Sequence, residues 1–202
     1  MTELQRIESR WGGHVPGPMN GRRFAVLVPF LESPDGLRLL LEVRSAGLKQ
    51  PGEVCFPGGR AEPGESFPDC ALRETFEELA IPAGEIRLLG QTDFLIHQKG
   101  FLLQPVLGLV SPAGLAKLSP SPAEVAEVFT APLSFFRDTP PTLSHYTLTA
   151  RAPEDFPYAL AGIRPDYPWG GSEVEVPVWQ YEGHAVWGLT ARILRHILAE
   201  LG

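Results

Sequence analysis

Short apolar runs, several of them rich in β-branched residues, recur along the chain and are separated by turn residues. The runs FAVLVPFL at 24–31 and LRLLLEVR at 37–44 flank SPDG, a pattern that predicts a β-hairpin. Similar runs predict further strands at 86–94, 101–110, 145–150 and 176–181. The segment EVAEVFTAPL, beginning at Glu124, predicts a strand that runs into a short helix.

Three segments have helical spacing instead. Residues 2–11 place Leu4, Ile7 and Trp11 on one stripe, and the C-terminal segment forms a second stripe from Leu189, Ile193, Ile197 and Leu201. A third helix is predicted from Ser66, a good N-cap residue, to about Leu79, with Pro82 helping to end it. No internal repeat or linker interrupts the pattern, which predicts one α/β domain over residues 1–202 with helices packed on a mixed sheet.

The third helix carries a cluster of glutamates. At about 100° per residue, Glu74, Glu77 and Glu78 share a face with Cys70 and Ile81. An apolar face for packing is predicted on the opposite side, from Ala71, Leu72, Thr75, Phe76 and Leu79. Like charges at this spacing repel by about 0.2–0.5 kcal/mol per pair, so one interpretation is a solvated acidic face and the other is a cation site.

The preceding loop favours the cation site. Gly58, Gly59 and Gly64 permit close backbone approach, and Glu65 lies eight residues before Arg73, a suitable ion-pair partner. A glycine-rich loop, a helix start and a carboxylate cluster together are typical of a site for a metal-bound phosphate, with Mg²⁺ or Mn²⁺ as the cation suited to hard oxygen ligands.

Composition narrows the possible partners. The net charge of −7 argues against a nucleic-acid polymer or an anionic membrane as the main partner. It remains compatible with a small anionic substrate that binds through a metal ion. Cys55 and Cys70 form no CxxC pair, which argues against a disulfide framework or a zinc-thiolate site. The N-terminal sequence lacks the apolar core of a signal peptide and no apolar run is long enough to span a membrane, so we expect a cytoplasmic protein.

The segment from Gly59 to Ile81 resembles the signature of the Nudix hydrolases: G, five residues, E, seven residues, then R-E-U-x-E-E-x-G-U with U apolar. The matching positions are Gly59, Glu65, Arg73, Glu74, Glu77, Glu78 and Ile81. Thr75 replaces an apolar residue and Ala80 replaces the second glycine, which is acceptable if that position does not need a positive φ. We call Gly59–Ile81 the Nudix box.

A second resemblance precedes the box. RSAGLKQPGEVCFPGG is similar to the extra motif of the coenzyme A pyrophosphatases, with matches at Arg44, Ser45, Gly52, Phe56, Pro57, Gly58 and Gly59. The interval from Ser45 to Gly52 is one residue shorter than in that subfamily, and Lys49 takes the position of a basic residue that is usually Arg. Lys provides a point charge where Arg provides a bidentate fork.

These resemblances imply a Nudix-type α/β/α sandwich with a central mixed sheet, and metal-dependent hydrolysis of the pyrophosphate bond of coenzyme A or acyl-CoA. The implied metal ligands are Glu74, Glu77, Glu78 and the Gly59 carbonyl, with Glu65 and Arg73 orienting them. Glu124 is implied as a further ligand or base, with Glu127 as its rival, and the implied substrate-binding residues are Arg44, Lys49, Gly58 and Gly59. Alternatives are a Nudix pyrophosphatase for ADP-ribose or another nucleoside diphosphate derivative, and a non-catalytic nucleotide-binding module.

Overall fold

We analysed a computed structural model that describes residues 2–11 and 21–202. These residues form two compact units, one from residues 1–31 and 56–121, the other from residues 32–55 and 122–202. Each unit is treated by itself below, and the expectation of a single domain over the whole chain stays a prediction.

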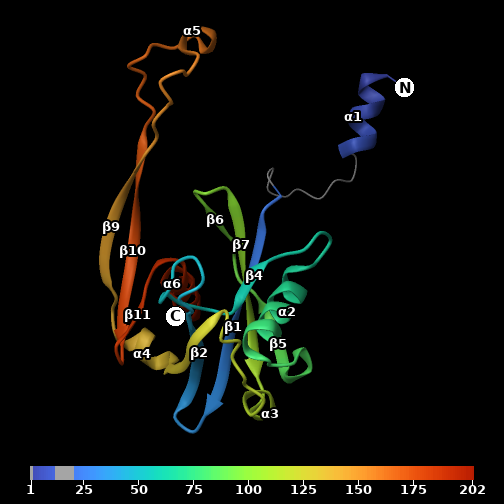
Figure 1. The fold of residues 1–202 in the computed structure, drawn as a ribbon, viewed down its shortest axis with the longest axis vertical. Coiled ribbons are helices and arrows are strands. Elements are labelled where there is room, and N and C mark those ends of the chain that lie inside the picture. Colours follow the sequence, from blue (N-terminus) through green and yellow to red (C-terminus); the bar gives the residue numbers. More distant parts are fainter. Residues whose placement is uncertain (1, 12–20) are drawn as a thin grey trace. The chain divides into compact units, whose positions relative to one another are not determined.

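The first unit contains a mixed sheet around β1 (Arg23–Ser33), of which this unit takes the part up to Leu31. β1 pairs in parallel with β7 (Phe101–Val110) and antiparallel with β4 (Gly58–Arg60). β7 also pairs antiparallel with β5 (Ile86–Gln91) and β6 (Leu95–His97). Helix α2 (Phe67–Leu79) packs against β4 and β7, as Figure 1 shows. The short elements are η1 (Ala83–Glu85), α3 (Pro112–Leu115) and the N-terminal α1 (Glu3–Trp11).

The second unit contains two antiparallel groups of strands. β2 (Gly36–Arg44) pairs with β3 (Val54–Cys55) and β8 (Val125–Pro132), and α4 (Leu133–Asp138) follows β8. β10 (Gly171–Tyr181) lies between β9 (Thr142–Thr149) and β11 (His184–Val186), with α5 (Tyr158–Ala161) in the loop between β9 and β10. Helix α6 (Gly188–Leu201) packs on β10 and β3. The core of the unit includes Leu39, Leu40, Leu41, Phe136, Trp179 and Leu194.

Most predicted elements form where the pattern places them. The connection between β1 and β2 is a tight turn in which Ser33 Oγ donates a hydrogen bond to the Gly36 carbonyl at 2.8 Å. β8 runs into α4, and Glu182 and Gly183 form the turn between β10 and β11 with φ of 48° and 87°. Over the described residues, no helix is both long and apolar enough to cross a membrane.

Two sequence expectations are wrong. The strand predicted over 86–94 ends at Gln91, and the chain then continues into the separate strand β6. Trp187, whose large apolar side chain directly after the strand segment HAV favours a core position, is 43% exposed because it lies at the N-cap of α6 rather than continuing β11. The helix predicted over residues 2–11 is present as α1, with Leu4 and Ile7 exposed.

Candidate active site

The first turn of α2 is fixed by its own sequence. Ser66 adopts an extended backbone, and its Oγ accepts a hydrogen bond from the Asp69 N–H at 3.2 Å while donating one to the Asp69 carboxylate at 2.5 Å. Pro68 lies in the first turn, where no intrahelical N–H is needed. At the other end Ala80 takes a left-handed conformation with φ 58°, and its N–H bonds to the Phe76 carbonyl. The predicted bounds of this helix are confirmed, and Ala80 occupies a position that does require a positive φ.

The buried face of α2 agrees in part with the face that periodicity predicts, since Ala71, Thr75 and Leu79 are fully buried as expected. Phe76, assigned to the packing face, is 54% exposed, whereas Cys70 is fully buried and Glu78 is 5% exposed. The helix is therefore rotated so that Cys70 and Glu78 point into the protein. This rotation is possible because the N–H of Gly58 in β4 donates to Glu78 Oε2 at 2.8 Å, which compensates a buried carboxylate.

Arg73 joins the loop before the helix to the helix itself. Its Nε lies 2.8 Å from Glu65 Oε1 and its Nη2 lies 3.0 Å from Glu65 Oε2, a bidentate pair that confirms the expected Glu65–Arg73 contact. Glu65 Oε2 also accepts the Glu62 N–H at 2.8 Å. The hydrogen bonds from Arg73 lower the pKa of Glu65 from 4.5 to about 2, and Glu65 in turn raises the pKa of Arg73. Glu65 thus stays ionised and holds the guanidinium in one orientation.

The remaining donor group of Arg73 faces two glutamates of the cluster. Nη1 lies 2.9 Å from Glu74 Oε1 and 3.1 Å from Glu77 Oε2. The Glu77 side chain is 52% exposed and that of Glu74 is 16% exposed, so the cluster runs from the protein interior at Glu78 to the surface at Glu77. The structure therefore brings the predicted carboxylates of the Nudix box together on one side of α2.

Two glycines let the backbone of β4 approach both β1 and α2. A Cβ added at Gly59 would lie 2.4 Å from the Glu74 carboxylate carbon, so only glycine leaves room for that side chain. A Cβ at Gly58 would lie 2.3 Å from the Ala25 carbonyl oxygen of the paired strand. The Gly59 carbonyl accepts a weak hydrogen bond from Cys70 Sγ at 3.6 Å, and burial raises the pKa of this thiol to about 11. The thiol therefore remains protonated and acts as a donor to the loop.

The other predicted site residues belong to the second unit. Arg44 Nε donates to the Lys49 carbonyl at 3.1 Å, and Lys49 itself is exposed. The Glu124 carbonyl accepts the Ser45 N–H at 2.9 Å, so Glu124 lies beside the Arg44–Ser45 segment within this unit. Its rival Glu127 is 55% exposed and lies 3.1 Å from His184 Nε2.

Sequence reasoning missed Glu42, a carboxyl buried in the same region. Its exposed fraction is 1%, its Oε1 accepts the Cys55 thiol at 3.3 Å, and its Oε2 has no hydrogen-bond partner among the described residues. Burial raises the pKa of Glu42 to about 7, a shift that Cys55 and Arg44 oppose and Glu124 reinforces. The sequence signal that could have revealed this carboxyl is the single glutamate directly after three leucines in LLLEVR. A glutamate inside an apolar strand is notable because glutamate is rarely buried without a partner.

The donor set of the Nudix box suits a hard divalent cation. Carboxylates from Glu74, Glu77 and Glu78, with the Gly59 carbonyl nearby, provide oxygen ligands only, as Mg²⁺ and Mn²⁺ prefer. In residues 2–11 and 21–202 no three His, Cys, Asp or Glu side chains already converge on one point in a way that could hold a metal. The reason is visible in the contacts: Arg73 draws Glu74 and Glu77 to itself, and the Gly58 N–H holds Glu78.

Comparison with known proteins places this geometry in a family. The NUDIX domain matches residues 21–138. A protein described as "Uncharacterized Nudix hydrolase NudL" from Photorhabdus laumondii is 38% identical over 207 residues, covering 99% of this chain and 98% of the relative. A protein of the same description from Yersinia pestis is 33% identical, covering 89% of this chain and 80% of the relative.

Solved structures show the same fold. A MutT/nudix family protein from Enterococcus faecalis superposes with a TM-score of 0.50 at 17% identity, covering 100% of this chain and 70% of that one. The Nudix hydrolase RenU from M. smegmatis gives a TM-score of 0.50 at 20% identity, covering 60% of this chain and 80% of that one. The fold is the Nudix α/β fold with a mixed central sheet and helices, as expected from the sequence. The chain belongs to the Nudix hydrolase family, whose members cleave pyrophosphate linkages in derivatives of nucleoside diphosphates.

Proposed function

We propose that the protein is a metal-dependent hydrolase of the pyrophosphate bond of coenzyme A or acyl-CoA, with 3′,5′-ADP and 4′-phosphopantetheine, or its acyl form, as products. The observation that carries the hydrolase part is the bidentate Glu65–Arg73 pair, which sets the orientation of Glu74 and Glu77 through Arg73 Nη1. Carboxylates alone repel a diphosphate, so this arrangement acts on such a substrate through a bound cation.

Each box residue has a task that follows from its contacts. Glu74, Glu77, Glu78 and the Gly59 carbonyl would hold Mg²⁺ or Mn²⁺, which supplies charge neutralisation at the phosphoryl oxygens and lowers the pKa of a bound water. Glu65 stays ionised near neutral pH, since the hydrogen bonds from Arg73 lower its pKa to about 2, and so it keeps Arg73 in place. Gly58 donates its N–H to Glu78 and thereby fixes the innermost carboxylate of the cluster.

The coenzyme A part of the proposal is supported by the motif from Arg44 to Gly59. In this proposal Arg44 and Lys49 bind substrate phosphate groups, including the 3′-phosphate that distinguishes coenzyme A from ADP-ribose. Arg44 donates from Nε to the Lys49 carbonyl and its side chain also bonds to Cys55, so phosphate binding by Arg44 competes with these contacts, whereas Lys49 is exposed. Glu124 is proposed as an additional metal ligand or base, and its backbone bond to Ser45 anchors it beside this motif.

One observation favours a second candidate, a nucleoside diphosphate derivative such as ADP-ribose. Lys49 provides one point charge where the related motif has an arginine fork, so discrimination for a 3′-phosphate rests largely on Arg44. A substrate without that phosphate would lose little binding free energy if Arg44 does not contact it.

The experiment is a direct comparison of substrates. Coenzyme A and ADP-ribose are incubated separately with the protein and Mg²⁺ or Mn²⁺, and the nucleotide product is identified by chromatography. We expect 3′,5′-ADP from coenzyme A, a larger kcat/KM for coenzyme A than for ADP-ribose, and loss of turnover after chelation. Glu78→Gln should bind coenzyme A and hydrolyse it at least about 100-fold more slowly. Faster turnover of ADP-ribose would contradict the coenzyme A assignment, and equal background turnover by the wild type and Glu78→Gln would contradict the hydrolase assignment.

A further inference from the structure

The loop between β2 and β3 is closed by hydrogen bonds at both of its ends. The N–H of Arg44 donates to the Glu53 carbonyl, and the N–H of Gly52 donates to the Arg44 carbonyl, each at 3.0 Å. Ser45, which follows Arg44, donates from its Oγ to the Ala123 carbonyl at 2.6 Å. The loop is therefore anchored to the rest of its unit, and its tip projects from a fixed base.

Gln50, at the tip of this loop, has a backbone conformation that is costly for a residue with a Cβ. Its φ is 60°, in the left-handed region. Its Nε2 donates to both carboxylate oxygens of Glu53, at 3.2 and 3.0 Å, and its carbonyl accepts the Glu53 N–H at 3.4 Å. Strained residues persist only where their surroundings hold them, and they are common at ligand-binding positions. Gln50 is therefore a candidate for a role in the site.

The residue before it, Lys49, has a fixed backbone and an unpaired charge. The Lys49 carbonyl accepts a hydrogen bond from Arg44 Nε at 3.1 Å. The planar peptide unit that contains this carbonyl also contains the Gln50 nitrogen, so a change of φ at Gln50 would reorient the carbonyl relative to the rest of the loop. The Lys49 side chain is exposed, and its ammonium makes no hydrogen bond or ion pair with any described residue.

The amide of Gln50 also holds the acid that could cancel this charge. Glu53 is the acidic residue closest to Lys49 in the sequence, four positions away. Both of its carboxylate oxygens accept from Gln50 Nε2, and it forms no ion pair within the described ranges. Because an ion pair between Glu53 and Lys49 would reduce the attraction of the ammonium for an anion, the Gln50–Glu53 contact leaves Lys49 available to a ligand.

We propose that Gln50 is a positioning residue for Lys49, and that Lys49 thereby binds a phosphate monoester such as the 3′-phosphate of coenzyme A. The inference rests on the proposed function and refines it, because it assigns recognition of the 3′-phosphate to Lys49 rather than to Arg44. Gln50 contacts no substrate group itself. It acts by holding the Glu53 carboxylate and the backbone at the tip of the loop, so that the ammonium meets the phosphate as an unpaired point charge.

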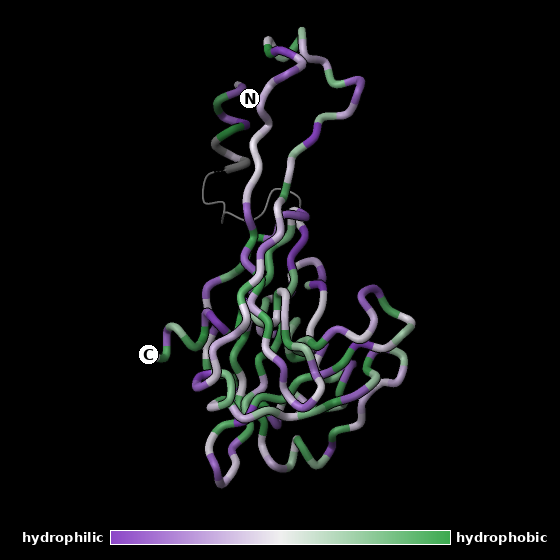
Figure 2. Tube along the Cα trace, turned by 90° about the vertical axis from the view of Figure 1, so that its left-hand side faces the viewer, coloured by the Kyte–Doolittle hydropathy of each residue, from purple (hydrophilic) through white to green (hydrophobic). Residues whose placement is uncertain are grey.

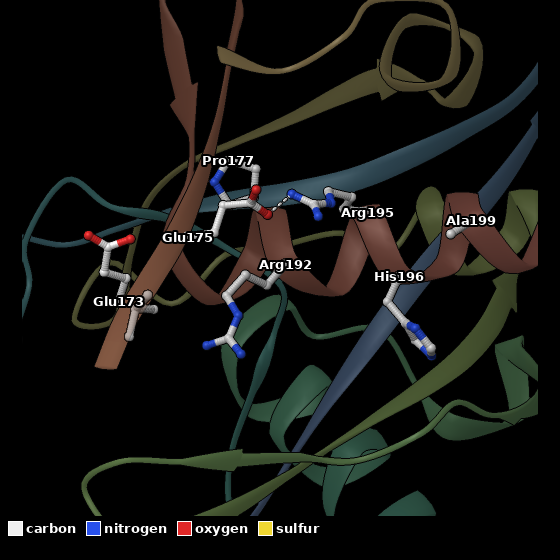
Figure 3. A pocket seen from close by; sticks show the side chains of 8 residues that line it. Glu173, Glu175, Pro177, Arg192, Arg195, His196 and Ala199 are labelled. Carbon is white, nitrogen blue, oxygen red and sulfur yellow. Dashed lines mark hydrogen bonds and ion pairs between the residues drawn. The ribbon is translucent and has the colours of Figure 1, made fainter. Parts of the chain in front are cut away.

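Two arginines of the same unit, also without a partner among the described residues, provide matched comparisons. Arg192 lies on the α6 wall of a cleft whose β10 wall carries Glu173 and Glu175 (Figure 3). Arg151 is exposed in the loop between β9 and β10, where hydrophilic and apolar stretches alternate (Figure 2). Neither belongs to the loop that holds Lys49, so removing either charge should not change the binding of a 3′-phosphate.

The test compares the binding of 3′,5′-ADP with that of 5′-AMP, which lacks only the 3′-phosphate. Neither nucleotide contains a pyrophosphate bond, so calorimetry with Mg²⁺ present measures binding without turnover. The wild type should bind 3′,5′-ADP about tenfold more tightly than 5′-AMP, and Lys49→Ala should remove this preference. Gln50→Gly keeps the left-handed backbone but releases Glu53, so it should weaken 3′,5′-ADP binding about two- to fivefold and leave 5′-AMP binding unchanged. Arg151→Gln and Arg192→Gln should leave both affinities unchanged.

The double variant Gln50→Gly with Glu53→Gln separates positioning from a general structural effect. It lacks the Gln50 amide and also the carboxylate that the amide holds, so the wild-type preference for 3′,5′-ADP should return. Circular dichroism of each variant reports whether it is folded. A wild type without the preference, a folded Gln50→Gly variant that binds like the wild type, or a double variant without rescue would overturn the proposal. So would a preference that Arg192→Gln removes and Lys49→Ala retains.

The outcome for this inference can be told apart from the outcome for the proposed function. If the wild type shows the preference, and the variants lose and regain it as expected, Gln50 positions Lys49 whether or not coenzyme A is hydrolysed. The absence of coenzyme A turnover in the same preparation would then contradict the proposed function alone. Turnover of coenzyme A with no effect of Gln50→Gly on 3′,5′-ADP binding would contradict this inference alone.

Discussion

Replacing Ala80 by glycine should stabilise the protein. Ala80 has φ 58° and ψ 20°, a left-handed conformation that costs a residue with a Cβ about 1–2 kcal/mol. Glycine adopts it freely, but its additional freedom in the unfolded chain offsets about 0.4–1 kcal/mol of that gain. The cap hydrogen bond from the residue 80 N–H to the Phe76 carbonyl is a backbone bond and survives the change. The net expectation is a gain of about 0.5–1 kcal/mol.

Urea unfolding followed by circular dichroism measures this gain, with the slope m expected to stay constant while the midpoint rises. In a thermal scan a protein of this size should gain about 1–4 °C. Ala116→Gly is the matched control: Ala116 also caps a helix and is exposed, but its φ of −66° is in the right-handed region. There glycine brings only the entropic cost, and stability should fall by about 0.5–1 kcal/mol.

The sign difference between the two variants is the decisive result. If Ala80→Gly and Ala116→Gly lowered stability equally, the left-handed conformation at Ala80 would store no strain. The physical account of the departure from the family pattern at this position would then be wrong.

Three further predictions concern groups in the two units. Burial raises the pKa of Glu42 from 4.5 to about 7, so its protonated form stabilises the fold fully below pH 4.5 and the contribution is lost as the pH rises to about 7. Glu42→Gln should make the urea midpoint less dependent on pH over that window, and above pH 7 it should raise the free energy of unfolding by about 3 kcal/mol relative to the wild type. An unchanged pH profile would contradict the assignment. Arg73→Lys keeps the positive charge but loses the bidentate hydrogen bonds of the guanidinium, so the Mn²⁺ affinity measured by calorimetry and kcat/KM should each fall about 10–100-fold. If both are retained, the guanidinium does not position the glutamates of the Nudix box. Gly59→Ala places a methyl group 2.4 Å from the Glu74 carboxylate carbon and should lower kcat/KM about 100-fold. Its control, Gly84→Ala, adds a methyl group with no heavy atom within 4 Å and should leave kcat/KM unchanged. Equal activities of the two variants would show that crowding against Glu74 does not affect the site.

The sequence was sufficient to predict α2 because its determinants are local. The Ser66 cap, the proline in the first turn and the Glu65–Arg73 spacing all act within a few residues of one another, and each is confirmed in the structure. The orientation of the helix was not predictable in the same way. Periodicity assigns faces by the polarity of side chains, and it cannot register that the Gly58 N–H compensates the burial of Glu78 while Phe76 is left exposed.

The same limit explains the other differences. The run LLLEVR is a local signal that Glu42 lies in an apolar strand, but its partner Cys55 lies 13 residues later across the β2–β3 pair, so the hydrogen bond to one oxygen of its carboxyl follows only from the pairing of the strands. The strand predicted over 86–94 ends at Gln91, where the pairing of β5 with β7 stops, and pairing does not follow from local composition. Local signals therefore predicted the elements and the box, whereas contacts between elements decided which polar groups are buried.

The contacts of Arg73 explain why a crowded set of carboxylates is compatible with a stable fold. Glu65, Glu74 and Glu77 carry three negative charges around one guanidinium, so this part of the network keeps a net charge of −2, and ionised Glu78 behind it adds one more. Arg73 therefore lowers the repulsion enough for the helix to form without neutralising it. With Glu78 counted, the formal charge of −3 exceeds that of one divalent cation, and the contacts of Arg73 with Glu74 and Glu77 run through one oxygen of each carboxylate, Oε1 and Oε2. Arg73 thereby positions the two carboxylates on one side of α2, which is the reason that Arg73→Lys is expected to weaken Mn²⁺ binding rather than strengthen it.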